Sequence, residues 1–307
     1  MTWNFEKVAG PYKGSCGGLA WDGESMLFSA VEESRVLRFS PATGQTEVFR
    51  RFTNRVNGLA FGPNHELFAG QEGSRRILEF LPDGSAAVHA YHLDGKLHNH
   101  PSDLVVDKVG RIWFADPYHA VATPGVQIFP PLDHASVLRL ECDLRRTALR
   151  GTWSIQRVTH DTAAPRAVLL SPDEKTLYVA EGDTRQPTRE LRAYPVREDR
   201  SVGAYSVLHT FGSDHRGAHR GIEGMCLDGD GNIVACAGWA QSGPGPLVYV
   251  FSPQGAVIAT HAFPGGMPVR CAFGGQDEGG DRKSLYVTTA DGFLYRARTS
   301  DRQGDKS

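Results

Sequence analysis

One phrase recurs six times along the chain, and this repetition constrains the fold more than any other feature. Each copy has a short apolar run, a turn rich in Asp, Gly or Pro, and a second apolar run. The copies begin at Gly18, Gly58, Asp103, Ala167, Gly224 and Cys271. Aligning the second runs places six large side chains in register: Phe28, Phe68, Trp113, Tyr178, Val234 and Tyr286. Short apolar runs separated by turn residues are typical of β-hairpins, so we expect six similar sheet units.

A small antiparallel sheet cannot bury both of its faces alone, and radial packing of six such sheets would cover them. We therefore predict an all-β, six-bladed β-propeller over residues 1–298, with four antiparallel strands in each blade. The early segment TWNFEKVAG is expected to complete the last blade. The insertion YHAVATPGVQIFPPLDHA is expected to cover one face, and the polar tail 299–307 to be frayed.

Charge and composition exclude several classes of function. The formal net charge is −2, whereas a nucleic-acid or anionic-membrane surface needs a concentrated basic patch. The sequence has no apolar run of about 18 residues, the length that a spanning helix needs, and its amino terminus lacks a secretory signal pattern. Five cysteines are scattered without CxxC pairs, which favours a reducing compartment. We expect a cytoplasmic protein, a monomer or small homo-oligomer, without nucleic-acid or membrane partners.

Several segments resemble the senescence-marker-protein/gluconolactonase family, which also includes luciferin-regenerating enzymes. They are NHPSDLVVDKVGRIWFADP, SPDEKTLYVAEGD, IEGMCLDGDGNIVACAGW and the closing CAFGG with SLYVTTADG. The resemblance spans roughly residues 10 to 298 and implies a six-bladed propeller of the metal-dependent lactonase type. It also implies one divalent cation, commonly calcium or zinc, on the propeller axis.

This chain departs from the family pattern at most of the implied ligand positions. The resemblance implies a Glu opening the first blade, an Asn before the fourth and an Asp in the fifth. We read these positions as Cys16, Arg166 and Glu223. A further Asn near the site is read as Ser102, and the Asp that is often assigned as general base as Asp103. Only one of the three ligand positions keeps its acid, so the metal site is altered.

Two interpretations of the altered site stay open. Replacing Glu by a neutral residue and Asn by Arg adds about two positive charges, which is what a divalent ion would supply. In the first interpretation Arg166, with Arg270, takes over the electrostatic role of the metal, since a guanidinium can pair with a carboxylate in bidentate fashion. No cofactor is then expected. In the second, calcium or zinc is retained by Cys16, Glu223 and His100.

The predicted site combines two groups of residues. The candidate catalytic residues are Glu223, Cys16, Arg166 and Asp103. The candidate substrate-binding residues are Arg270, His100, Asn99, Ser102, Asn57 and Glu72. Alternatives remain for several of them: Cys16 is a nucleophile, a metal ligand or a buried pocket-lining residue, Asp103 a base or a turn cap, and Glu72 a pocket wall or an ion-pair partner.

Three functions fit this sequence. The leading hypothesis is a lactonase-type hydrolase acting on a sugar-acid lactone or similar polar ester, with a pocket in the central channel. The second is a metal-independent lyase, isomerase or condensing enzyme that acts on a carboxylated small molecule through Glu223 and Cys16. The third is a propeller that binds a small polar or anionic molecule without turning it over.

Overall fold

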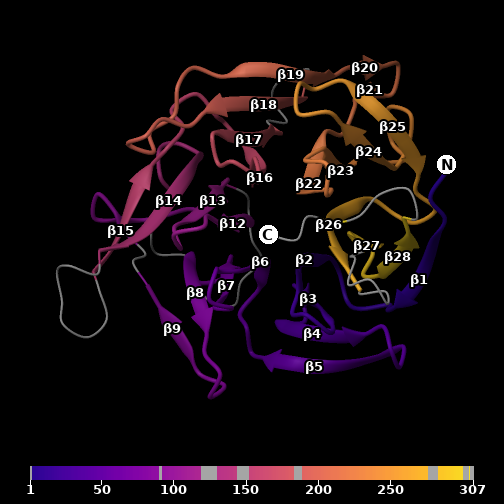
Figure 1. Ribbon diagram of the computed structural model, residues 1–307, viewed down its shortest axis with the longest axis horizontal. Helices are drawn as coiled ribbons and strands as arrows, with labels where there is room; N and C mark the ends of the chain where they lie inside the picture. Colours follow the sequence, from indigo (N-terminus) through magenta and orange to yellow (C-terminus); the bar gives the residue numbers. More distant parts are fainter. Residues whose placement is uncertain are drawn as a thin grey trace.

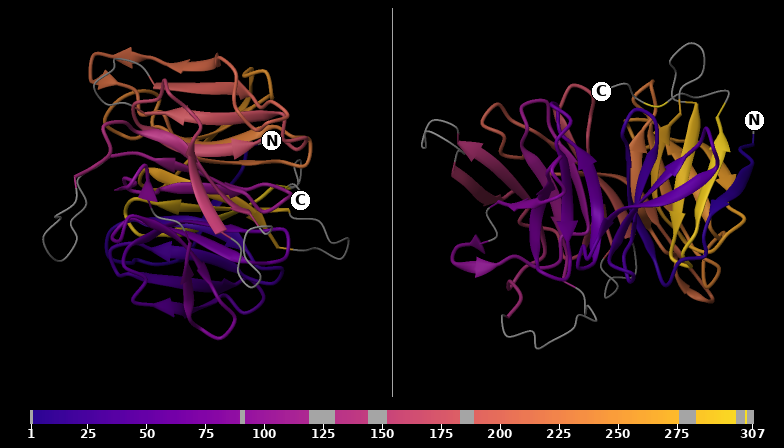
Figure 2. Two further views of the ribbon diagram at one scale, coloured as in Figure 1. Left: turned by 90° about the vertical axis from the view of Figure 1, so that its left-hand side faces the viewer. Right: turned by 90° about the horizontal axis from the view of Figure 1, so that it is seen from below.

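The computed structural model describes residues 2–89, 92–118, 130–143, 152–182, 189–275 and 283–299, together with Gly304. Six four-stranded antiparallel sheets surround a central channel (Figure 1), which confirms the predicted six-bladed propeller. The side views show the sheets packed face to face around that axis (Figure 2). The expected covering insertion lies largely outside the described residues, since residues 119–129 are not among them.

Each blade runs from an inner strand at the channel to an outer strand at the rim. Blade 1 consists of β2 (Cys16–Trp21), β3 (Met26–Ala30), β4 (Arg35–Ser40) and β5 (Gln45–Arg51). Blade 2 consists of β6 (Val56–Phe61), β7 (Leu67–Gln71), β8 (Arg76–Phe80) and β9 (Ala86–Val88). Blade 3 consists of β12 (Asp103–Val106), β13 (Ile112–Asp116), β14 (Ser136–Asp143) and β15 (Thr152–Arg157).

The second half of the chain repeats this arrangement. Blade 4 consists of β16 (Pro165–Leu170), β17 (Thr176–Glu181), β18 (Arg189–Pro195) and β19 (Ser206–Phe211). Blade 5 consists of β22 (Ile222–Leu227), β23 (Ile233–Ala237), β24 (Leu247–Phe251) and β25 (Val257–Ala262). Blade 6 consists of β26 (Pro268–Gly274), β27 (Ser284–Thr289), β28 (Leu294–Arg298) and β1 (Phe5–Ala9). Two small hairpins link blades: β10 (His92–Leu93) with β11 (Lys96–Leu97), and β20 (Ser213–Asp214) with β21 (Gly217–Ala218).

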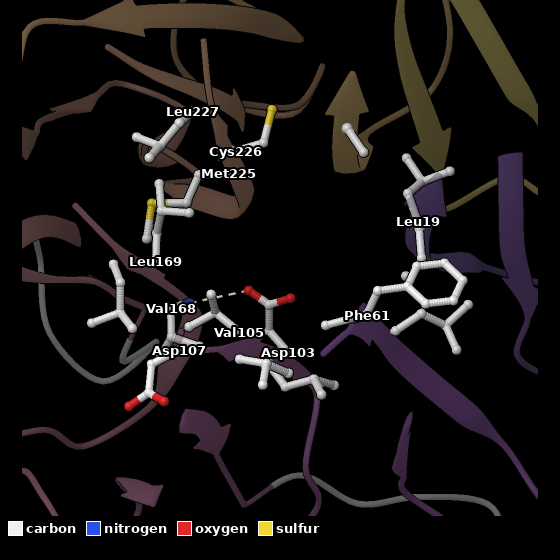
Figure 3. Close-up of a pocket in the computed structure, with 18 of the residues that line it drawn as sticks. Leu19, Phe61, Asp103, Val105, Asp107, Val168, Leu169, Met225, Cys226 and Leu227 are labelled. Atoms are coloured by element: carbon white, nitrogen blue, oxygen red, sulfur yellow. Dashed lines mark hydrogen bonds between the residues drawn. The ribbon is translucent and has the colours of Figure 1, made fainter. Parts of the chain in front are cut away.

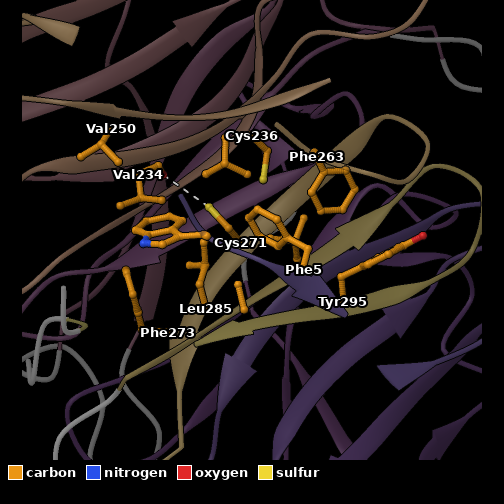
Figure 4. Packing of buried hydrophobic residues seen from close by; sticks show 13 residues of the cluster. Phe5, Val234, Cys236, Val250, Phe263, Cys271, Phe273, Leu285 and Tyr295 are labelled. Carbon is orange, nitrogen blue, oxygen red and sulfur yellow. Dashed lines mark hydrogen bonds between the residues drawn. The ribbon is translucent and has the colours of Figure 1, made fainter. Parts of the chain in front are cut away.

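The first and last segments of the chain share blade 6, as predicted. Strand β1 pairs antiparallel with β28, with Phe5 opposite Ala297. Phe5 packs edge-on against Phe263 and joins a buried cluster that spans blades 5 and 6 (Figure 4). Pairing the first and last strands of the chain in one sheet closes the ring, so that blades 1 and 6 cover each other's faces.

Aspartates and glycines set the tight turns between inner strands and their neighbours. In blade 3 the Asp107 carboxylate accepts the Val109 and Arg111 amides and the Trp113 indole N–H. Gly110 in the same turn has φ of 86°, a left-handed conformation that other residues avoid. These contacts fix the hairpin register and so the direction of the side chains on the inner strand.

Four of the six aligned second-strand residues pair with the third residue of their copy, whereas Phe28 and Tyr286 pair with the second. Phe68 pairs with Ala60 and Trp113 with Val105, whereas Phe28 pairs with Leu19, one position earlier in the repeat. The turn from Trp21 to Met26 is one residue shorter than its counterpart in blade 2, so the predicted alignment of blade 1 was wrong by one residue.

The predicted fraying of the tail is not what its described residues show. Thr299 is fully buried, and its backbone N–H donates to the Lys283 carbonyl at 2.8 Å. Gly304 forms an antiparallel bridge with Asp228, which lies just after β22. Gly304 therefore lies beside the turn that follows the inner strand of blade 5.

Candidate functional site

A β-bulge interrupts five of the six inner strands at the same mouth of the channel. In blades 4, 5 and 6 the bulged residues are Arg166, Glu223 and Val269. In blades 1 and 2 the bulges fall on the pairs 17–18 and 57–58. A bulge turns side chains out of the regular alternation, and here it directs one residue of each affected blade towards the mouth.

These residues enclose a polar cavity of about 140 Å³, which we call the polar chamber. It is lined by Ser15, Asn57, Glu72, Ser102, Arg166, Glu223, Met267, Val269 and Arg270. Six of the predicted site residues therefore meet in one small space. Its volume restricts a ligand to the size of one small molecule.

Glu223 lies in the polar chamber among three arginines. Its carboxylate Oε1 accepts a hydrogen bond from Arg220 Nε at 2.6 Å. Burial alone would raise the pKa of Glu223, but the charges of Arg220, Arg166 and Arg270 and the Arg220 hydrogen bond together lower it. The carboxyl group is therefore ionised at neutral pH.

Arg270 crosses the channel at the inner end of the polar chamber. Its Nη1 donates to the carbonyls of Glu223 and Val269, and its Nη2 donates to those of Ser102 and Arg166. These carbonyls belong to four successive blades. Gly224 makes room for the side chain, since a Cβ there would lie 2.6 Å from Arg270 Cδ. The guanidinium is thus a fixed positive charge on the propeller axis.

A second cavity of about 560 Å³ lies on the other side of Arg270, and we call it the apolar chamber (Figure 3). Its wall combines apolar side chains, such as Leu19, Phe61, Leu169 and Met225, with charged residues that include Asp107, Lys108 and Glu174. Asp103 also faces this chamber. The prediction that Asp103 and Glu223 belong to one site is therefore wrong, because they line different cavities. Its carboxylate pairs with Arg270 Nε at 3.3 Å and accepts the Val168 amide. Burial raises the pKa of Asp103 to about 6, although Arg270 opposes the shift.

The expectation that Cys16 faces the axis beside Arg166 is wrong. Cys16 is fully buried in the core between blades 1 and 6. Burial, with the nearby charges of Glu32 and Asp291, raises the pKa of its thiol to about 12, which makes a reactive thiolate unfavourable. The residue in phase with Arg166 and Glu223 is Gly17, and a Cβ there would lie 2.5 Å from Asn57 Oδ1. Asn57 therefore fills this part of the wall.

Asn99 and His100 also fall outside the polar chamber. Asn99 is fully buried: its amide oxygen accepts the Leu132 N–H, and its Nδ2 donates to the His134 carbonyl. It therefore holds the segment before β14 in place. His100 is buried against the Tyr118 ring, with the ring centroids 5.7 Å apart. Both residues shape the loop before blade 3. Neither lines the polar chamber, so the prediction that they bind substrate there is wrong.

Sequence reasoning missed Arg220, Ser15 and Met267. Arg220 stands three residues before Glu223, and this short spacing was the available signal for an ion pair. Ser15 lines the cavity in place of its neighbour Cys16. Gly182 was also overlooked: a Cβ there would lie 2.6 Å from Arg166 Cγ, so this glycine leaves room for the Arg166 side chain.

The residues present fit a divalent cation poorly. At the three implied ligand positions the structure places Gly17, Arg166 and Glu223, which together offer a single carboxylate. That carboxylate already binds Arg220, and Arg166 has no lone pair to donate. Among the described residues, no cluster of three or more His, Cys, Asp or Glu side chains could hold a metal ion.

The chain belongs to the family described as the SMP-30/Gluconolactonase/LRE-like region, whose model matches residues 16–291. It is 27% identical to a gluconolactonase of Zymomonas mobilis subsp. mobilis over 278 residues, covering 84% of this chain and 72% of that protein. A gluconolactonase structure from Xanthomonas campestris is 25% identical with a TM-score of 0.78, covering 96% of this chain and 89% of the other. A luciferin-regenerating enzyme, 18% identical over 98% and 97% of the two chains with a TM-score of 0.72, shares the fold. In the described part of this chain no helix is long and apolar enough to cross a membrane.

Proposed function

We propose that this protein is a lactonase-type hydrolase that opens a small sugar-acid lactone or similar polar ester in the polar chamber, without a catalytic metal. Membership of the family supports the reaction class, and relatives named gluconolactonase support the substrate class. The observation that carries the proposal is the juxtaposition of an ionised Glu223 with fixed guanidinium groups and unpaired polar atoms in one small cavity.

Two buried oxygen atoms of the polar chamber are suited to bind hydroxyl groups. Asn57 Nδ2 donates to Glu72 Oε1 at 2.7 Å, which fixes the orientation of the amide. Asn57 Oδ1 and Ser102 Oγ have no hydrogen-bond partner among the described residues. A buried polar atom without a partner costs about 1–3 kcal/mol, which a hydrogen bond from a polyhydroxylated ligand would offset.

Glu223 would act as the general base in this proposal. Its carboxylate takes a proton from a water molecule, whose oxygen attacks the lactone carbonyl carbon. The carbonyl becomes an oxyanion, which the Arg166 guanidinium stabilises. When the oxyanion collapses, the ring C–O bond breaks and the leaving oxygen receives the proton from Glu223. The product hydroxy acid then releases one proton at neutral pH, and its carboxylate can pair with Arg166.

The arginines would supply the positive charge that a cation supplies in metal-dependent relatives. Arg166 is in the cavity wall, whereas Arg270 is held by four carbonyls and Asp103. We therefore assign Arg166 to the reacting oxyanion and Arg270 to the fixed potential around Glu223. This division follows from the contacts, since Arg270 has fewer donors left for a ligand.

A Glu223→Gln variant tests the proposal. The amide keeps the shape but cannot accept a proton, so we expect kcat/KM for proton release from aldonolactones to fall by about 100-fold, or ~2.7 kcal/mol. The matched control is Glu174→Gln, which makes the same change at the opposite end of the channel and should keep wild-type rates. Equal rates in wild type and Glu223→Gln would refute the assigned base. Lactone-induced thermal stabilisation without turnover by wild type would favour a binding protein instead.

A further inference from the structure

Cys226, Cys236 and Cys271 come together between blades 5 and 6, although they are far apart in the sequence. Cys226 lies on β22, Cys236 on β23 and Cys271 on β26. The Sγ atoms of Cys226 and Cys271 are 3.6 Å apart, close to van der Waals contact. Because the cysteines are scattered in the sequence, their proximity is a property of the folded ring.

Two of the three cysteines have access to the channel. Cys226 and Cys271 line the apolar chamber, whereas Cys236 does not and is fully buried behind them. Figure 3 shows the Cys226 side chain at the edge of this chamber, and Figure 4 shows Cys271 and Cys236 in the adjoining core. Of the three cysteines, only this pair therefore lines the chamber that a small neutral oxidant would enter.

The surroundings give the two thiols different roles. Hydrogen bonds from the Cys226 and Cys236 thiols, together with the Arg270 charge, lower the pKa of Cys271, despite burial. The hydrogen bond to Cys271 and burial raise the pKa of Cys226. In its protonated form Cys271 also donates to the Val234 carbonyl at 3.3 Å. Cys271 is thus the thiol more readily converted to the nucleophilic thiolate.

We propose that Cys226 and Cys271 are an oxidisable dithiol, which a hydroperoxide entering the apolar chamber converts into a disulfide joining blades 5 and 6. This inference concerns the opposite side of Arg270 from the proposed hydrolysis and does not depend on it. Closing the bridge requires the sulfur atoms to approach from 3.6 Å to about 2.05 Å.

The reaction balances with hydrogen peroxide as the two-electron oxidant. The Cys271 thiolate attacks one peroxide oxygen, the O–O bond breaks, and a sulfenic acid forms as hydroxide leaves and is protonated to water. Cys226 then loses its proton and attacks the sulfenic sulfur, releasing the second oxygen as water. Two thiols and one peroxide thus give one disulfide and two water molecules.

Thiol counting and peptide mapping on the full-length protein test this proposal. Five thiols are free before treatment. After treatment with hydrogen peroxide, denaturation and titration, we expect three thiols, an intact mass lower by two hydrogens, and one linked peptide pair containing Cys226 and Cys271. Five remaining thiols, or a bridge between other cysteines, would overturn the proposal. Because wild type is the sample, this result does not depend on a variant that folds.

Two variants assign the roles within the pair. In Cys226→Ser the sulfenic acid on Cys271 has no thiol partner at 3.6 Å, so dimedone should label Cys271 and no bridge should form. The control is Cys142→Ser on β14, outside the cluster, which should bridge as wild type does. Dimedone labelling of Cys226 in Cys271→Ser at the same rate would contradict the assignment of Cys271 as the attacking thiol.

Discussion

The two chambers of the channel are formed by the same six blades, yet they differ in the residues that line them. The polar chamber is lined by Glu223, Arg166, Asn57 and Ser102, many of them at or beside bulges. The apolar chamber is lined by the regular continuation of those strands, with Leu, Val and Phe side chains around Asp103. The comparison shows that bulges in five of the six inner strands gather polar residues at one mouth of the channel.

Arg270 separates the two chambers and contacts both. Its guanidinium holds four carbonyls on one side and the Asp103 carboxylate on the other. Glu223 lines the polar chamber and Asp103 lines the apolar chamber, and neighbouring arginines lower the pKa of both carboxyl groups against the effect of burial. Glu223 has several cationic neighbours and its pKa is lowered, whereas burial outweighs the one arginine beside Asp103. The difference between the chambers is therefore electrostatic as well as geometric.

Replacing Arg270, which separates the two chambers, should produce the largest effect, a loss of folding stability. Arg270→Met keeps most of the side-chain length but leaves Asp103 and several carbonyls buried without their donor. We expect the free energy of unfolding to fall by at least about 3 kcal/mol, measured by urea denaturation. Arg51→Met, at the exposed end of β5, should change it by less than about 0.5 kcal/mol. A small effect at Arg270 would show that its contacts do not hold the blades together.

The raised pKa of Asp103 predicts a pH-dependent stability in the apolar chamber. The folded protein holds this proton up to about pH 6, while the unfolded chain releases it near the ordinary value of 3.8. The stabilisation is therefore full below pH 3.8 and is lost as the pH rises through 6. Asp103→Asn lacks this titration, so its unfolding free energy minus that of wild type should rise by about 2 kcal/mol from pH 4 to pH 7.

The control for that comparison is Asp230→Asn, on an exposed turn of blade 5. Its difference from wild type should stay constant over the same pH range. A constant difference for Asp103→Asn as well would show that the Asp103 carboxyl is ionised throughout, and the two chambers would then not differ in the way argued above.

Arg166 offers a sharper probe of the polar chamber alone. Arg166→Met should lower kcat/KM for aldonolactones by about tenfold, or ~1.4 kcal/mol, because the oxyanion loses its guanidinium partner. Stability should change less than in Arg270→Met, since Arg166 is half-buried and its side chain lines the cavity. Wild-type kinetics would remove Arg166 from the mechanism and leave Arg220 and Arg270 as the sources of positive charge around Glu223.

The repeat pattern predicted the architecture because each blade is built from local hairpins whose turns are visible in the sequence. The closure of blade 6 by β1 followed from the same count of strands. Bulges have no comparable signal. Reading Cys16 as the position equivalent to Glu223 was therefore wrong by one residue, and the register of β2 assigns that position to Gly17.

The sequence predicted the lining of the polar chamber best at positions where an inner strand begins. Other residues of the site were harder to predict. Asn57, Ser102, Arg166 and Glu223 all occupy that position and all line the polar chamber. Asp103 directly follows Ser102, and the alternation of a strand directs it to the other chamber. The ion pair of Glu223 with Arg220 and the role of Arg270 as a partition depend on side-chain directions across blades, which no local pattern encodes.

Removal of metal should produce the smallest change. If the guanidinium groups supply the positive charge in the polar chamber, dialysis against EDTA should leave kcat/KM for lactones unchanged, and added calcium or zinc should not raise it. Elemental analysis of the purified protein, measured beside activity, checks that metal has been removed. A loss of activity that calcium or zinc restores would contradict the metal-free proposal. It would require Arg166 to leave the position shown here, because a fixed guanidinium near Glu223 repels a second cation.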